Sequence, residues 1–267
     1  MTADPLSLVL VGYGALVLFM LGLWAVQLLV RNASIADVGF CIGLIAVVLW
    51  YTGQASGETE RKLLVMVMVC LYAGRLGLFL LMNRVIGKAE DARYQALRRR
   101  WGTQERWRMF GYFQLQAAAV TTFSLPFLVV MQNPRPPFGL AELAGVLIGV
   151  GGILGEAVAD VQLSRFRRRS WNRDRVCREG LWYLSRHPNY FFEWLHWWAY
   201  VVMAFGAPGW PLTLIGPVGM GWALLKVTGI PWAEQRALET KGDDYREYQQ
   251  TTNAFVPWWP KRPISRH

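Results

Sequence analysis

One stretch of this chain leads from a basic polar turn directly into an apolar helix that carries an acid and an imidazole. Pro188 suits the first turn of that helix, because its fixed φ and missing N–H cost nothing there. Glu193, His196 and Trp197 follow at spacings of three and four residues, which place them on one helix face. Because ionisable groups inside a membrane are costly and mark functional sites, a membrane location would give this stretch a chemical role.

The composition indicates an integral membrane protein. Of the 267 residues 54% are hydrophobic and 14 are tryptophan, and the mean hydropathy is positive. The uncharged run over residues 5–30 is too long for a secretory signal and predicts a first spanning helix. The three cysteines are widely spaced, which favours buried thiols over a disulfide framework or a zinc site. We therefore expect no metal.

Seven apolar segments are each near the length that crosses a bilayer. They cover residues 5–30, 34–53, 62–82, 109–131, 140–162, 190–207 and 210–230. Residues 83–109 hold eight bases against three acids, and residues 163–189 hold eight against two. Because basic loops stay in the cytoplasm, we expect the N-terminus outside and the C-terminus in the cytoplasm. The net charge of +10 therefore points to membrane lipids and not to nucleic acid, and residues 1–267 are predicted to form a single all-α membrane domain.

The costly polar groups of the spans gather on the cytoplasmic side in this topology. Tyr72 lies near the middle of the third segment, and Asp37 lies one turn into the second. The other members are Arg75, Arg84, Glu156, Asp160, Arg167, Glu193 and His196. Guanidinium groups match phosphates, and aromatic side chains can form the wall of an apolar chamber. The sequence predicts a pocket that takes an anionic, water-soluble cofactor from the cytoplasm and an apolar substrate from the lipid.

Several of these residues also have a purely structural explanation. Asp37 could cap the second helix, and Tyr72 could be a packed aromatic residue. Glu193 could form a buried ion pair with Arg186, and the arginines of residues 165–169 could hold their helix end at anionic headgroups. Their gathering at one depth is what favours a site.

Glycines in the fifth segment predict that another helix packs closely against it. Gly145 and Gly149 form one small-xxx-small pair, and Gly151 and Gly155 form a second. The nearby glycine string has no preceding strand, so it does not predict a dinucleotide-binding Rossmann fold.

The run Ser-Arg-His-Pro-Asn-Tyr at residues 185–190, with its flanking residues, closely resembles the C-terminal signature of the steroid 5-alpha-reductase family, in its bacterial branch. Residues 156–166 resemble that family's fifth-helix pattern, and residues 71–84 resemble its tyrosine-then-arginine third helix. The resemblance covers roughly residues 33–258, with the signature over about 140–258.

This resemblance implies seven membrane helices in a bacterial cytoplasmic membrane, NADPH in a cytoplasm-facing cavity, and reduction of the Δ4 double bond of a 3-oxo steroid. Tyr72 matches the tyrosine that hydrogen-bonds the substrate ketone. Asp37 stands where mammalian members have a glutamate, which is a departure from the pattern. The implied cofactor-binding residues are Arg75, Arg84, Glu156, Asp160, Arg167, Arg186, His187, Asn189, Tyr190, Glu193, Trp197 and Tyr245. No obligate protein partner is implied.

A membrane methyltransferase of the isoprenylcysteine carboxyl type is the closest alternative. Such enzymes also show an Arg-His-Pro-x-Tyr turn and a later glutamate followed by Tyr-x-x-Tyr, parts that Glu234, Tyr245 and Tyr248 would play here. The many arginines favour the phosphates of NADPH over the nearly neutral S-adenosylmethionine. A non-catalytic sterol or lipid carrier is a third hypothesis.

Overall fold

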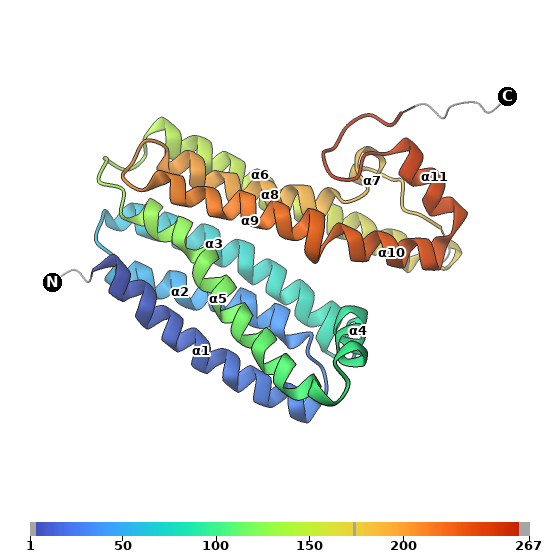
Figure 1. Ribbon diagram of the computed structural model, residues 1–267. Helices are drawn as coiled ribbons and strands as arrows, with labels where there is room; N and C mark the ends of the chain where they lie inside the picture. Colours follow the sequence, from blue (N-terminus) through green and yellow to red (C-terminus); the bar gives the residue numbers. More distant parts are fainter. Residues whose placement is uncertain (1–3, 173–174, 262–267) are drawn as a thin grey trace. The chain divides into compact units, whose positions relative to one another are not determined.

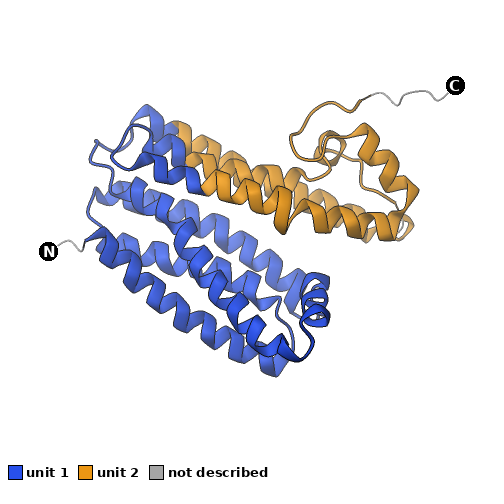
Figure 2. Cartoon of the chain, in the orientation of Figure 1, with its two compact units in different colours: residues 1–143, 200–215 blue, residues 144–199, 216–267 orange. Residues whose placement is uncertain are grey.

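The computed structural model describes residues 4–172 and 175–261 and is 80% helical, with no strand among those residues. Arg173 and Asp174, which belong to the second basic loop, lie outside the described residues. The chain divides into two compact units, one of residues 1–143 with 200–215 and the other of residues 144–199 with 216–267 (Figure 2). The boundaries fall within or at the ends of continuous helices and not in a linker.

The first unit contains the N-terminal helices, labelled in Figure 1. They are α1 (Pro5–Val30), α2 (Ile35–Gln54), α3 (Thr59–Leu80), α4 (Ala92–Trp101) and α5 (Glu105–Met131). A π-helical turn, Leu81–Val85, extends α3. The carboxylate of Asp4 caps α1 by accepting from Ser7 N at 3.2 Å, and Pro5 occupies the first turn. Helix α2 packs against α3 and α5, and α1 packs against α5 and α2.

The second unit contains most of α6 (Leu140–Arg168) and α8 (Pro188–Ala204), the short α7 (Leu181–Leu184), and nearly all of α9 (Ile215–Trp222). Two further helices, α10 (Ile230–Lys241) and α11 (Asp243–Thr251), follow a π-helical turn at Ala223–Val227. A short 3₁₀ helix, Trp210–Leu214, precedes α9 and belongs to the first unit. Helices α4, α7, α10 and α11 lie outside the predicted apolar segments.

Close packing of α6 on α8 follows from two glycines. A Cβ on Gly152 would lie 2.9 Å from the backbone N of His196, and one on Gly155 would lie 2.3 Å from the Phe192 ring. A Cβ on Gly151 would meet nothing within 4 Å. The predicted close approach is present, but Gly152 and Gly155 face α8 and Gly151 does not.

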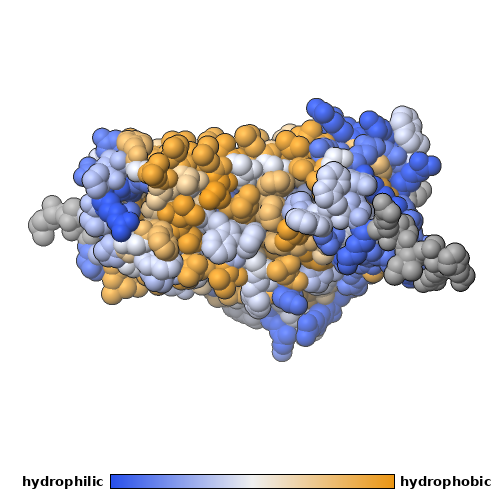
Figure 3. All heavy atoms as spheres, turned by 90° about the horizontal axis from the view of Figure 1, so that it is seen from above, coloured by the Kyte–Doolittle hydropathy of each residue, from blue (hydrophilic) through white to orange (hydrophobic). Residues whose placement is uncertain are grey.

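Among the described residues, six helical stretches are long and apolar enough to cross a membrane, one fewer than predicted. The difference is α8, whose 17 residues rise only about 25 Å, less than a typical hydrocarbon core. Large apolar side chains such as Leu18 and Leu29 are 69% and 85% exposed on the helix surfaces, which suits contact with lipid tails. In Figure 3 hydrophobic side chains gather over the long helices of the second unit, and hydrophilic ones gather over its C-terminal helices. The length and composition of these helices are compatible with an integral membrane protein.

Candidate functional site

The turn that precedes α8 is held by a dense set of polar contacts inside the second unit. The guanidinium of Arg186 donates from Nε to Glu234 Oε1 at 2.7 Å, and from Nη1 to the carbonyls of Gln249 and Thr252 at 3.0 and 2.6 Å. The backbone N of Arg186 donates to Asn253 O at 2.9 Å. Arg186 thus pairs with Glu234, and its donors are directed at groups of the chain itself.

Glycine is required where this segment begins. Gly180 has a φ of 60°, and a Cβ there would lie 2.4 Å from the Gln162 amide nitrogen. The same amide accepts from Leu181 N at 2.9 Å through its oxygen, so α7 starts directly against α6. Trp182 Nε1 then donates to Ala159 O at 2.9 Å, which fixes α7 on the same helix.

His187 is buried beside the same glutamate. Its Nε2 lies 3.3 Å from Glu234 Oε1, and its ring stacks on Tyr190 with centroids 5.5 Å apart and an interplanar angle of 6°. Burial lowers the pKa of His187 below the usual 6.5, and the Glu234 contact only partly opposes this. The imidazole is therefore neutral at pH 7.

Helix α11 completes the cluster around Glu234. Gln249 donates to Glu234 Oε2 at 2.8 Å, and the Tyr245 hydroxyl lies 3.4 Å from Oε1. Burial, followed by the Glu234 charge, raises the pKa of Tyr245, so its hydroxyl stays protonated. Tyr248 donates to Ser185 O at 3.1 Å, at the base of the turn. Of these residues only Tyr245 was predicted as a cofactor ligand; Glu234 and Tyr248 carry the pattern of the alternative methyltransferase.

A second polar pair joins α6 to the start of α8. Asn189 donates from Nδ2 to Asp160 Oδ1 at 3.4 Å, and its Oδ1 is buried without a hydrogen-bond partner among the described residues. Asp160 is 7% exposed and Glu156 is 3% exposed. Arg167, two helical turns further along α6, is attracted by the Asp160 charge and repelled by that of Arg236 in α10. Nothing in the sequence had pointed to Arg236.

Other predicted residues of α8 lie within the same unit. His196 and Trp197 are fully buried, and His196 Nδ1 lies 3.2 Å from Gly149 O. Glu193 is partly buried. All of the predicted site residues from Glu156 to Tyr245 therefore belong to the second unit.

The predicted residues Asp37, Tyr72, Arg75 and Arg84 belong to the first unit. The carboxylate of Asp37 accepts from the Tyr94 hydroxyl at 2.7 Å, from Arg93 at 2.7 Å and from Arg84 at 3.3 Å. Asp37 thus binds side chains of α4 and of the π-helical turn and does not cap α2, whose N-cap residue is Ser34. Tyr94 was missed because it lies in the loop that appeared only basic.

Tyr72 is fully buried in α3, and Arg75 lies one turn nearer the end of that helix. Arg84 reaches Asp91 at 3.6 Å as well as Asp37, so two carboxylates of the chain already neutralise it. The assignment of Tyr72 and Asp37 to catalysis stays a prediction, as does that of Arg75 and Arg84 to nucleotide binding.

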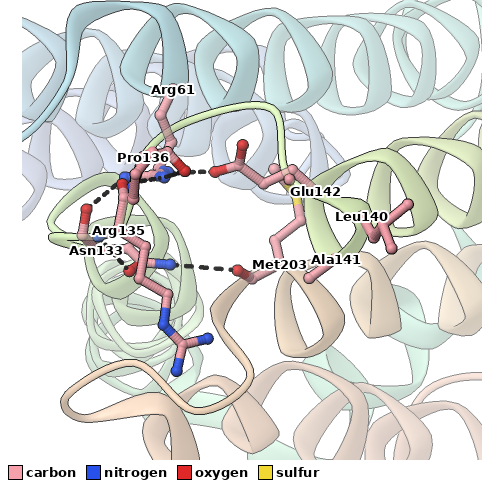
Figure 4. A pocket seen from close by; sticks show the side chains of 9 residues that line it. Arg61, Asn133, Arg135, Pro136, Leu140, Ala141, Glu142 and Met203 are labelled. Atoms are coloured by element: carbon pink, nitrogen blue, oxygen red, sulfur yellow. Dashed lines mark hydrogen bonds and ion pairs between the residues drawn. The ribbon is translucent and has the colours of Figure 1, made fainter.

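A cavity of about 220 Å³ is lined by residues that include Arg61, Arg135 and Glu142 (Figure 4). Arg61 lies in the first turn of α3. Arg61, 1% exposed, forms an ion pair with Glu142 there and donates to the carbonyls of Asn133, Arg135 and Pro136. The guanidinium of Arg135 donates to Phe205 O and Gly206 O at 2.9 and 2.7 Å. Because the donors in this cavity are bound to the chain itself, the contacts serve to join loops and offer little to a ligand.

Across the described residues the chain is all-helical, with six candidate membrane-spanning helices and an apolar surface that is compatible with a membrane protein. Residues 23–252 match the family described as protein of unknown function (DUF1295), so the chain belongs to that family. This family is related to steroid 5-alpha-reductase-like membrane proteins. No curated protein and no solved structure matches the chain.

Proposed function

We propose that this protein is a membrane-embedded reductase that uses NADPH to reduce the C=C bond of an enone, with Δ4-3-oxo steroids as the substrate class. In this proposal α8 is a seventh membrane helix, the N-terminus is outside, and both basic loops and the C-terminus face the cytoplasm of a bacterial cell. Two findings support the proposal. Residues 185–190 resemble the reductase signature, and the family of this chain is related to steroid 5-alpha-reductase-like membrane proteins.

The observation that carries the proposal is the polar pair at the α6–α8 contact. Asp160 is a buried carboxylate, and Asn189 Oδ1 is a buried acceptor with no hydrogen-bond donor among the described residues. Such an acceptor is costly to leave without a donor. The ribose hydroxyls and the carboxamide of a nicotinamide nucleotide are donors that fit such acceptors.

The charges beside this pair suit the phosphates of the same ligand. Arg167 and Arg236 are both exposed and repel one another. A phosphate group placed between them would convert that repulsion into two charge-assisted contacts. The residues present therefore fit a phosphorylated dinucleotide.

Arg186, His187 and Tyr245 act in this proposal by positioning. Glu234 contacts all three side chains. The turn that contains Arg186 and His187 leads directly into Asn189. A fixed turn keeps the Asn189 amide beside Asp160, which lowers the entropy lost when a ligand binds.

NADPH, when bound, supplies the hydride for the reduction. As hydride reaches the β-carbon, negative charge develops on the substrate carbonyl oxygen, so a hydrogen bond from the Tyr72 hydroxyl to that oxygen would stabilise the transition state. A proton taken up from water at the α-carbon completes the reduction. Tyr72 is fully buried, and a donor is stronger in such a dry environment.

One observation favours the methyltransferase as a second candidate. Glu234, Tyr245, Arg186 and His187 do meet in one cluster, and these are the residues that its pattern names. S-adenosylmethionine carries no phosphate, however, so it leaves the Arg167–Arg236 repulsion uncompensated.

The test is a titration of the purified protein in detergent with NADPH, NADH and S-adenosylmethionine, followed by intrinsic tryptophan fluorescence. We expect NADPH to bind more tightly than NADH, and Arg167→Ala to reduce that preference. Arg168→Ala, which removes the neighbouring exposed charge, is the matched control. Binding of S-adenosylmethionine without NADPH would replace the proposal by the methyltransferase, and binding of neither would favour a lipid carrier.

A further inference from the structure

The first basic loop of the first unit divides its charges into two sets. Arg93 and Arg98 point into the unit, where Arg93 binds Asp37 and Asp91, and Arg98 binds Glu90 and Glu105. Arg84 binds Asp37 and Asp91 as well. The three acids of the loop are therefore all used by these three arginines.

The whole excess positive charge of the loop consequently lies on exposed side chains. Lys88 is exposed near its start, and the others form a basic rim that we define as Arg99, Arg100, Arg106 and Arg108. None of the four rim arginines forms an ion pair within residues 4–172 and 175–261. The ion pair of Arg98 with Glu105 joins the end of α4 to the start of α5, so the rim belongs to one end of the unit (Figure 1).

Tryptophans accompany the basic rim. Trp107 is 71% exposed and stacks on Trp24 of α1 with centroids 6.5 Å apart. The Arg106 guanidinium lies 5.9 Å from the Trp24 ring, and Trp24 Nε1 donates to Arg106 O at 3.3 Å. Exposed tryptophan beside arginine is typical of the membrane–water interface.

The length of α5 would place the rim at the depth of lipid headgroups. From Arg108 to Met131, α5 rises about 35 Å, which exceeds the roughly 30 Å hydrocarbon core. Leu115 is 64% exposed and follows Arg108 by two helical turns on the same face. A headgroup at Arg108 would therefore have its acyl chains beside Leu115.

We propose that the basic rim, with Trp107, binds the phosphodiester headgroup of an anionic membrane lipid. Guanidinium groups form bidentate contacts with phosphate oxygens. The continuous path from charged headgroup level to the apolar surface of α5 suits a lipid, whereas a soluble phosphate would make no use of Trp107 or Leu115. This site does not depend on the reductase proposal.

The experiment is native mass spectrometry of the full chain in detergent, titrated with phosphatidylglycerol, phosphatidylcholine or glycerol 3-phosphate. We expect phosphatidylglycerol to bind most tightly. The pair Arg106→Gln and Arg108→Gln should weaken it by about tenfold or more, since each base near an anionic surface contributes on the order of a few-fold.

The matched control is Arg168→Gln with Arg175→Gln, which removes two exposed bases from the other basic loop. It should leave phosphatidylglycerol binding near that of the wild type. Equal losses in the two double variants would show a net-charge effect and overturn the site. Equal binding of phosphatidylcholine, or binding of glycerol 3-phosphate as tight as that of the lipid, would overturn it too. Both double variants should keep the thermal stability of the wild type, because the residues are exposed.

Discussion

The Tyr94 hydroxyl donates a 2.7 Å hydrogen bond to Oδ1 of Asp37, although the two residues are 57 positions apart. Arg93 binds the other carboxylate oxygen at 2.7 Å. A carboxylate in the first turn of α2 is thus stabilised by side chains of the loop helix α4. Whatever Asp37 does in catalysis, it also holds α4 to the spanning helices.

Tyr94→Phe should lower the free energy of unfolding by about 1 kcal/mol, because it leaves an oxygen of the half-buried Asp37 carboxylate without this donor. Thermal unfolding in detergent measures the loss. Tyr112→Phe is the matched control: its hydroxyl lies 3.4 Å from that of Tyr94 and does not reach Asp37 by any bond that the structure shows. If the two variants were equally stable, the Tyr94–Asp37 hydrogen bond would make no specific contribution to the free energy of unfolding.

Tyr72→Phe should reduce enone turnover by about a hundredfold to a thousandfold, the usual loss when one donor to a developing oxyanion is removed. The Kd for NADPH should change little. Tyr51→Phe removes another fully buried hydroxyl, one bonded to Ser124 at 3.0 Å, and serves as the control for packing. Unchanged turnover in Tyr72→Phe would remove this residue from the proposed chemistry.

Gly152→Ala should destabilise the second unit by about 1–3 kcal/mol, because the new methyl group overpacks the contact with the His196 backbone. Gly151→Ala, at the preceding residue, has open space and should be neutral or slightly stabilising. The melting temperatures of the two variants test this directly. Similar values for both would mean that α6 and α8 do not approach at Gly152.

Arg61→Met should cost about 3–5 kcal/mol of stability, since it leaves the buried Glu142 carboxylate without its partner. Glu60→Gln changes the charge of the adjacent exposed residue and should have almost no effect. Chemical or thermal unfolding of both variants gives the comparison, and a small loss in Arg61→Met would show that the ion pair is not needed.

Stability should fall as the pH is lowered from about 7.5 to 5.5. The pKa of His187 is lower in the folded state than the ordinary 6.5, so the unfolded chain binds the proton more readily. The contribution of the neutral His187 imidazole to stability is complete above pH 6.5, and it is lost as the pH falls toward the pKa of the folded state. His187→Gln should flatten this part of the profile of melting temperature against pH; an unchanged slope would assign it to other groups.

The long apolar helices could be predicted from sequence because each depends on local signals. The bounds of α1 agree with the predicted span of residues 5–30, since Asp4, Pro5 and an uncharged run mark its start and length. Helix α4 could not be predicted in this way. Its ten residues are rich in arginine, and ion pairs with Asp37, Glu90 and Glu105 hold it in place.

The site residues also divide into those with a local sequence signal and those that depend on contacts between distant residues. The Arg186–His187 turn is evident in the sequence, but the identity of its partner is not, because Glu234 lies 48 residues from Arg186. The Glu-then-Tyr-x-x-Tyr pattern was the signal for that partner. For Asp37 no comparable pattern names Tyr94, since the contact arises only when α4 folds back over α2.

Deuterium transfer tests the central claim most directly. The protein is incubated with NADPH deuterated at C4 of the nicotinamide and with a Δ4-3-oxo steroid, and the product is analysed by mass spectrometry. We predict a saturated 3-oxo product with one deuterium on the former β-carbon, and no such product from Tyr72→Phe. Absence of the product from the wild-type protein that binds NADPH, or a product without deuterium, would contradict the proposed reaction.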